Sequence, residues 1–263
     1  MTGSAPVVLV TGAARGIGRA VVRRMVARGA LVHALDACQG DAGGTPYPMA
    51  TRRDLDALVA EAPDQVTGYV ADVRDGDQLD RALATILQQH GRLDSVVAGA
   101  AVIEGGDALW DTDPALLGRL WSTDVMGVWQ TARASVPFLM TQPAGRTPSF
   151  VVITSAAGSR GLWHLAAYCT VKHAATGLVR GLAADLADTH VTVCGVAPGS
   201  TDTDMLAATA AIYGLDGVEE LASSQAGGRV LEPDEVAGVV EFAAFAGPVV
   251  HGSILDADGG FGG

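Results

Sequence analysis

The stretch TGAARGIG, Thr11 to Gly18, stands between an apolar run at Val7–Val10 and an Ala-rich helical pattern that begins at Gly16. Glycines permit a tight turn and let the backbone approach a phosphate group, while free N–H groups at a helix start attract anions. The spacing is Gly12-x3-Gly16-x-Gly18, which departs from the G-x-G-x-x-G fingerprint. A glycine turn alone is common, so the rest of the chain decides its meaning.

Asp36 supplies the second part of a nucleotide site. It ends the next apolar run, where dinucleotide-binding units carry an acidic residue about 20 positions after the glycine turn. A carboxylate there accepts hydrogen bonds from ribose hydroxyls and repels a 2′-phosphate. Arg15 is able to attract such a phosphate, but Asp36 outweighs it. The pattern predicts NAD rather than NADP.

Short Val-, Ile- and Leu-rich runs alternate with helical patterns along the whole chain. The predicted strands are Val7–Val10, Leu31–Leu35, Val66–Ala71, Ser95–Ala98, Phe150–Thr154, Val191–Val196 and Ser253–Asp256. The predicted helices are Gly16–Arg28, Arg52–Glu61, Gly76–His90, Pro114–Thr141, Ala166–Ala187 and Glu232–Ala246. This alternation predicts an α/β fold with one doubly wound parallel sheet of about seven strands.

No compositional break divides the chain, so residues 1–263 are expected to form a single Rossmann-type domain. Residues 37–51 are Gly- and Pro-rich and are expected to form an insertion loop, after which Thr51 and Asp54 cap the next helix. Residues 202–228 follow a Pro-Gly pair and mix helix formers with glycines, which suits a substrate lid.

Composition excludes several classes of function. Hydrophobic residues make up 49% of the 263 residues, and the formal net charge is -12. Such an acidic chain repels nucleic-acid backbones and anionic membrane surfaces. Cys38, Cys169 and Cys194 form no disulfide framework or metal-ligand pattern, so no metal is expected. With neither a signal peptide nor a membrane span recognisable, a cytoplasmic location is expected.

Tyr168 and Lys172 stand one helical turn apart in the otherwise bland stretch AAYCTVKHAATGL, Ala166 to Leu178. A cation about 4 Å from the phenol favours the phenolate by roughly 4 kcal/mol at an effective dielectric near 20, before desolvation is subtracted. The pair is therefore expected to lower the pKa of Tyr168 toward working pH. The alternative is a Lys side chain extending past a half-buried Tyr.

With these pieces in hand, the chain resembles the classical short-chain dehydrogenase/reductase family over essentially its whole length. The matching motifs are TGAARGIG, ADV at 71–73, ITSAAG at 153–158, Tyr168-x3-Lys172 and APGSTDT at 197–203. The resemblance implies Tyr168 as acid/base, Lys172 on the nicotinamide ribose, and Ser155 orienting the substrate oxygen. It also implies a homotetramer.

The resemblance implies a cofactor site that covers the whole dinucleotide. Asp72 and Val73 would contact adenine, and Thr201 and Thr203 the carboxamide end. The full expected set is Gly12, Arg15, Gly16, Ile17, Gly18, Asp36, Asp72, Val73, Ala98, Tyr168, Lys172, Pro198, Gly199, Thr201 and Thr203.

Two departures concern the catalytic end. The family's Asn-Asn-Ala-Gly is replaced by AGAA at 98–101, which leaves only a backbone contact near Ala98. Asp124 replaces the asparagine that supports a water linking the lysine to solvent. Asp124 is able to accept from the same water, but its charge would alter the proton relay, and it is included with the catalytic residues.

The long segment between Asp36 and Asp72, with the phrases AAYC and DADGGFGG, resembles the mycofactocin-associated subfamily. That resemblance implies a nicotinamide held without free exchange and reoxidised in place by an external redox partner. The insertion loop is then expected to fold over the adenosine end of the cofactor and slow its release.

The predicted function is reversible hydride transfer between NAD and a secondary alcohol or ketone. The alternatives are a 3-oxoacyl-carrier-protein-type ketoreductase and, from another class, a non-catalytic NAD-binding sensor or scaffold. Several apolar and aromatic residues are candidates for a hydrophobic substrate pocket. They are Trp110, Leu162, Trp163, His164, Met205, Leu206 and Tyr213.

Overall fold

The computed structural model describes residues 5–143 and 146–262, so residues 1–4 of the predicted domain lie outside the described residues. Seven parallel strands form one sheet in the order β3-β2-β1-β4-β5-β6-β7. The strands are β1 Val7–Thr11, β2 Leu31–Asp36, β3 Val66–Val70, β4 Ser95–Ala98, β5 Ser149–Ile153, β6 Thr192–Pro198 and β7 Ile254–Ala257. The predicted fold class is confirmed.

In the part of the chain that the structure describes, eight α-helices connect and cover the strands. They are α1 Gly16–Ala27, α2 Arg52–Glu61, α3 Gly76–His90, α4 Pro114–Asp124, α5 Met126–Met140, α6 Ala166–Asp185, α7 Asp204–Ile212 and α8 Pro233–Phe245. Short 3-10 turns lie at Gly40–Gly43, Ala156–Gly158, Val218–Ser224 and Gly247–Val250. None of the helices that the structure describes is long and apolar enough to cross a bilayer.

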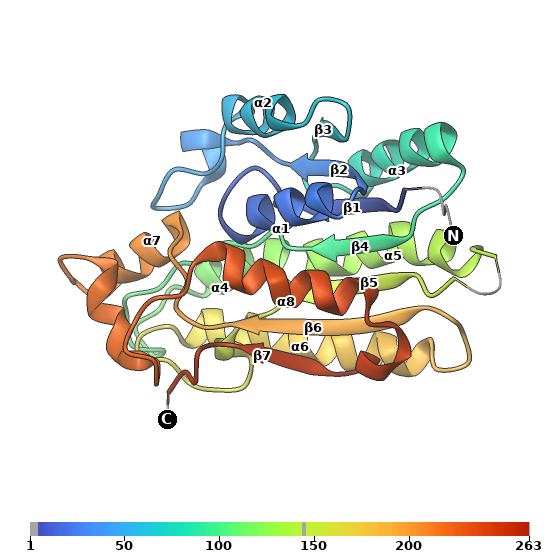
Figure 1. Cartoon of the computed structure of the whole chain (residues 1–263). Coiled ribbons are helices and arrows are strands. Elements are labelled where there is room, and N and C mark those ends of the chain that lie inside the picture. Colours follow the sequence, from blue (N-terminus) through green and yellow to red (C-terminus); the bar gives the residue numbers. More distant parts are fainter. Residues whose placement is uncertain (1–4, 144–145, 263) are drawn as a thin grey trace.

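Alternate residues of the central strands face two separate cores. In β1, Val8 and Val10 pack with α1, α2 and α8, whereas Val7 and Leu9 pack with α3, α5 and α6. Side chains point to opposite faces along a strand, so a sheet covered on both sides needs apolar residues at every position. Figure 1 shows helices on both faces of the sheet, with the lid helix α7 beyond the strand ends.

Two local features differ from or refine the sequence prediction. The prediction of a single helix at Pro114–Thr141 is wrong, because the chain kinks at Val125 (φ -111°, ψ -59°) and forms two helices, α4 and α5. The kink directly follows Asp124, whose carboxylate is bound inside the protein. The predicted cap of α2 is confirmed, since Thr51 and Asp54 form a reciprocal capping box.

A buried histidine makes the β2–β3–α3 layer sensitive to acid. His33 on β2 is 1% exposed, its Nδ1 lies 3.1 Å from the Tyr69 hydroxyl, and its ring lies 5.0 Å from the His90 ring. Burial, aided by the nearby His90, lowers the pKa of His33 to about 4. The unfolded chain therefore binds a proton at higher pH than the native protein does.

This linkage predicts that stability is lost as pH falls from about 6.5 to about 4, by up to about 3 kcal/mol from His33 alone. Above that window the contribution is fully present, because both states are neutral. Urea unfolding of His33→Phe between pH 7 and 4 should show a shallower pH dependence than the parent. His173→Gln, which replaces an exposed histidine, is the control and should keep the parent's slope. An unchanged slope in His33→Phe would contradict the assignment.

Candidate active site

A cavity of about 800 Å³ lies at the carboxyl ends of the strands, beside β1 and β4. Strand order changes direction there, and in open α/β sheets ligands bind at such a point. The insertion loop (residues 37–51) and the lid (residues 202–228) lie at the same end of the sheet (Figure 1). The cavity volume is at the upper end of the range for small-molecule and cofactor sites, roughly 300–1,000 Å³.

The glycine turn after β1 is packed backbone against backbone. Gly12 has φ +66°, and a Cβ there would lie 2.7 Å from the Ala100 Cα of the segment after β4. A Cβ on Gly18 would overlap the Gly12 carbonyl oxygen. Any side chain would therefore push the start of α1 away from the strand ends, and the cradle fits the close approach of a phosphate.

Asp36 is fixed at the cavity wall by two backbone amides. Its carboxylate oxygens accept from the Ala14 N–H at 3.1 Å and the Cys38 N–H at 3.0 Å. Arg15 is not free to attract a 2′-phosphate, because its guanidinium donates to the Pro48 carbonyl at 2.6 Å and pairs with Asp204 at 3.2 Å. Charge at this end of the cavity therefore favours a ribose with free hydroxyls.

The insertion loop also reaches the neighbouring strand end. The Gln39 side-chain amide donates to Asp72 at 3.0 Å, and Asp72 pairs with Arg74 at 2.6 Å. Gly43, Gly44 and Thr45 of the same loop also line the cavity. The loop thus forms a wall over the end where the sequence places an adenosine.

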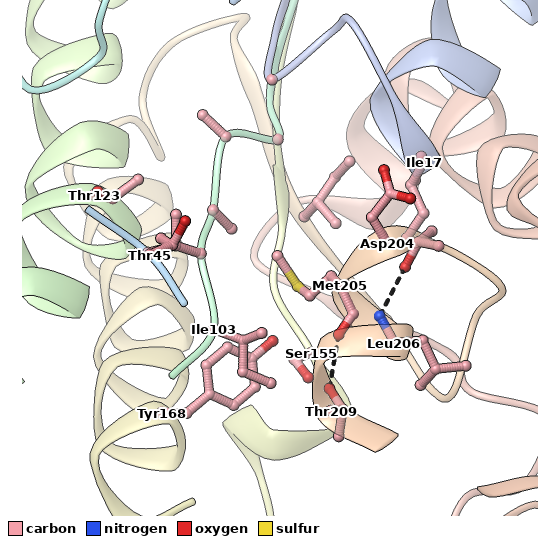
Figure 2. A pocket seen from close by; sticks show the side chains of 18 of the residues that line it. Ile17, Thr45, Ile103, Thr123, Ser155, Tyr168, Asp204, Met205, Leu206 and Thr209 are labelled. Carbon is pink, nitrogen blue, oxygen red and sulfur yellow. Dashed lines mark hydrogen bonds between the residues drawn. The ribbon is translucent and has the colours of Figure 1, made fainter. Parts of the chain in front are cut away.

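Ser155, Tyr168 and Lys172 come together at the other end of the cavity. Ser155 follows β5, and its hydroxyl accepts from the Ala157 N–H at 3.1 Å. Tyr168 and Lys172 stand in the first two turns of α6, and their residues are only 6% and 3% exposed. The Tyr168 phenol and the Ser155 hydroxyl point toward one another in Figure 2, so the two residues predicted as proton donor and orienting hydroxyl share one hollow.

The sequence-based expectation for the pKa of Tyr168 is wrong for this arrangement. Burial of the phenol raises its pKa, and although Lys172 opposes that effect, the carboxylate of Asp124 adds to it. The Lys172 ammonium lies 5.5 Å from the centre of the Tyr168 ring and 2.9 Å from Asp124. Burial is the largest of these effects, so the pKa of Tyr168 lies above that of a free tyrosine and the phenol is protonated at neutral pH.

Asp124 lies behind the cavity rather than on its wall. One carboxylate oxygen pairs with the Lys172 Nζ at 2.9 Å, and the other accepts from the Val102 N–H at 3.0 Å. Burial is the largest single effect and lowers the pKa of Lys172, but Asp124, together with Tyr168 and Tyr47, more than offsets it, so the pKa is raised and the lysine stays charged. The expected water-mediated contact is replaced by a direct buried ion pair.

Most other expected residues do line the cavity. They are Gly12, Arg15, Gly16, Ile17, Gly18, Asp36, Asp72, Val73, Pro198, Gly199, Thr201 and Thr203. Ala98 does not line it, since it ends β4 and is 2% exposed, and Gly99, Ala100 and Ala101 form the wall instead. The strand itself is covered on both faces, so only the residues after its end reach the cavity.

The apolar half of the cavity is bounded by the lid and by the loop before α6. Leu162, Trp163, Met205, Leu206 and Tyr213 all line it. Figure 2 shows Met205, Leu206 and Thr209 on the lid side, facing Thr45 and Thr123 across the hollow.

Two residues that the sequence analysis proposed for the substrate pocket do not line the cavity. Trp110 is 82% exposed outside the cavity, and the His164 ring is bound to the Gly106 carbonyl at 2.7 Å.

Sequence reasoning missed Tyr47. Its hydroxyl accepts from the Ile103 N–H at 3.1 Å, and its ring packs with the apolar cluster that includes Tyr168. The only signal in the sequence was an aromatic residue between two prolines in a Gly-rich loop. Among the residues described, no group of three or more His, Cys, Asp or Glu side chains is arranged to hold a metal ion.

Comparison with known proteins agrees with this geometry. Residues 6–213 match the family model for short chain dehydrogenases. An uncharacterized NAD-dependent oxidoreductase of Mycobacterium tuberculosis is 37% identical over 203 residues, covering 76% of this chain and 73% of that protein. A (-)-trans-carveol dehydrogenase of Rhodococcus erythropolis is 33% identical over 207 residues, covering 76% and 72%.

The fold is shared with solved structures at lower identity. A 3-ketoacyl-(acyl-carrier-protein) reductase from Brucella melitensis, crystallised with NADH, superposes with a TM-score of 0.82. The match is 24% identical and covers 97% of each chain. The family match, the relatives and the arrangement of Ser155, Tyr168 and Lys172 lead to one conclusion: this chain belongs to the short-chain dehydrogenase family of oxidoreductases.

Proposed function

We propose that the protein transfers a hydride reversibly between NAD(H) and a hydrophobic secondary alcohol or ketone. The observation that carries the proposal is one continuous cavity, with Asp36 at one end and Ser155, Tyr168 and Lys172 at the other. A dinucleotide with its ribose at Asp36 would extend along the glycine cradle toward Tyr168. The M. tuberculosis relative is named as NAD-dependent, which supports this choice of cofactor.

The chain's own residues would supply orientation and the proton. Bound NAD+ supplies a hydride acceptor at its nicotinamide ring. Tyr168 gives a proton to the carbonyl oxygen during reduction and takes it back during oxidation, while the Ser155 hydroxyl donates a hydrogen bond to that oxygen. Lys172, held charged by Asp124, would orient the nicotinamide ribose.

The substrate half of the cavity favours an apolar alcohol. Its lining residues include Leu162, Met205, Leu206 and the rings of Trp163 and Tyr213. The R. erythropolis relative is named as a dehydrogenase of carveol, which is itself a hydrophobic secondary alcohol. Asp36 and the engaged Arg15 speak against an NADP-dependent carrier-protein ketoreductase. The three catalytic side chains would serve no purpose in a pure NAD sensor.

We also propose that the protein forms a homo-oligomer through α4 and α5. These helices leave large apolar side chains exposed, although the other face of α5 packs on β4 and β5 and the other face of α4 packs on α6. The exposed residues are Leu117, Trp121, Met126, Trp129, Phe138 and Met140. A second copy packed on this surface would remove it from water.

Replacement of Tyr168 by Phe tests the proton-transfer role. The ring would still fill its site, so folding and NAD binding should persist while turnover falls by about 10²–10⁴-fold. The assay is NADH formation with a panel of secondary alcohols, and bound NAD is measured in parallel. Near-parental turnover in Tyr168→Phe would rule out the mechanism.

Asp36 should set the choice of cofactor. In Asp36→Ala combined with Ala37→Arg, the negative charge is removed and a partner for a 2′-phosphate is added, so NADP use should rise relative to NAD. The ratio of kcat/KM for the two cofactors is the measurement. A parent enzyme that already prefers NADP would contradict the proposal.

The insertion loop should slow cofactor exchange, because Gln39 and Pro48 bind the loop across the adenosine end. We expect the purified protein to carry NAD, and an artificial electron acceptor to accelerate turnover by reoxidising NADH in place. An external redox partner would have that task in the cell. The mass of the copurified nucleotide and the acceptor response are the measurements. Cofactor-free protein with fast turnover on added NAD would show free exchange.

A further inference from the structure

Two adjacent backbone amides after β4 are bound by side chains from different parts of the chain. The Val102 N–H donates to Asp124 at 3.0 Å, and the Ile103 N–H donates to the Tyr47 hydroxyl at 3.1 Å. Asp124 comes from the end of α4, and Tyr47 from the insertion loop. The same short segment therefore connects the insertion loop to the catalytic ion pair.

The segment has no helix or strand of its own to hold it. Residues 99–106 lie outside regular structure, between the end of β4 and the approach to α4. Its first two amides, of Gly99 and Ala100, are bound by the Thr11 hydroxyl at 3.1 and 3.4 Å. Beyond them, the bonds to Asp124 and Tyr47 hold the Val102 and Ile103 amides, and two bonds to His164 hold Gly106. Loss of the bond to Asp124 or to Tyr47 would leave a buried amide unpaired in a stretch that forms part of the cavity wall.

The ion pair of Asp124 and Lys172 needs that backbone to stay in place. Both residues are at most 3% exposed, and a buried pair is stable only when its geometry is held and its remaining polar atoms are satisfied. The Val102 amide is the further donor that the structure gives Asp124. A shift of the Val102–Ile103 backbone would therefore move the carboxylate and, with it, the Lys172 ammonium beside Tyr168.

We propose that Tyr47 is a positioning residue of the catalytic site: by binding the Ile103 amide it keeps Val102 on Asp124, and so keeps Lys172 in place. This role rests on the proposed function, because it acts on the Tyr168–Lys172 pair. The insertion loop would then act at the catalytic end of the cavity. The sequence analysis did not predict this role.

The surroundings of Tyr47 suit a fixed, neutral anchor. The Arg15 guanidinium lies 5.6 Å from the centre of its ring and donates to the adjacent Pro48 carbonyl at 2.6 Å. Burial raises the pKa of Tyr47 to about 12, although the Ile103 amide and Arg15 oppose it, so the phenol brings no second negative charge near Asp124. Tyr47 packs against the apolar cluster that includes Val102, Ile103 and Tyr168.

The test is a double-variant cycle on the full-length protein. In Tyr47→Phe the ring stays and only the hydroxyl is lost, so kcat for alcohol oxidation should fall about 10-fold with KM changed by less than about 2-fold. In the Asp124→Asn background the same change should alter kcat by less than about 2-fold, because the link it acts through is already altered. Tyr69→Phe is the matched control, since that phenol bonds His33 and Tyr69 does not line the cavity. It should leave kcat unchanged.

Urea unfolding of the parent, Tyr47→Phe, Asp124→Asn and the double variant gives a second measurement that does not depend on turnover. The midpoint of the double variant should fall by less than the sum of the two single decreases. Effects on kcat that multiply, or midpoint decreases that add, would overturn the proposal. If the parent oxidised no secondary alcohol, the proposed function would fail, and the urea cycle alone would decide whether Tyr47 and Asp124 are linked.

Discussion

The buried ion pair between Asp124 and Lys172 is the constraint on which the catalytic end depends. Two charges away from water are stable only as a pair with well-held geometry, and the 2.9 Å contact needs α4, α6 and the segment after β4 to meet. Asp124 helps to keep the lysine charged, while burial, to which the Asp124 carboxylate adds, raises the pKa of Tyr168 in spite of Lys172. A neutral asparagine at this position would leave the Lys172 charge free to act on the Tyr168 phenol. The Asp124 carboxylate instead competes with the phenol for that charge.

The sheet supplies the frame in which that contact forms. Because the strand order changes direction between β1 and β4, the turn carrying Gly12 and the segment carrying Ala100 come into backbone contact at the strand ends. The cavity then runs from Asp36, across this contact, to Ser155 and Tyr168. The insertion loop closes one side, and Arg15 joins it to the lid through Pro48 and Asp204.

Sequence reasoning succeeded where local pattern and function coincide. The inner strands could be recognised because they are buried on both faces and read as apolar runs, and the glycine turn could be recognised because a Cβ there would overlap neighbouring backbone. It failed for features that are determined by contacts between residues far apart in the sequence. The kink at Val125, the direct pairing of Asp124, and the bond from Tyr47 to Ile103 each depend on partners far away in the sequence.

The amino-acid sequence by itself determined the α/β fold, the order of its elements and the placing of Tyr168 and Lys172 on one helix face, because periodicity, turn glycines and one-turn spacing are local properties. The catalytic role proposed for that pair came from the resemblance to a family. Only the tertiary structure decided the electrostatic state of that pair. Burial and Asp124 raise the pKa of Tyr168, against the expectation from Lys172 alone. Desolvation and charge pairing depend on what surrounds a group in space, which spacing along one helix does not contain.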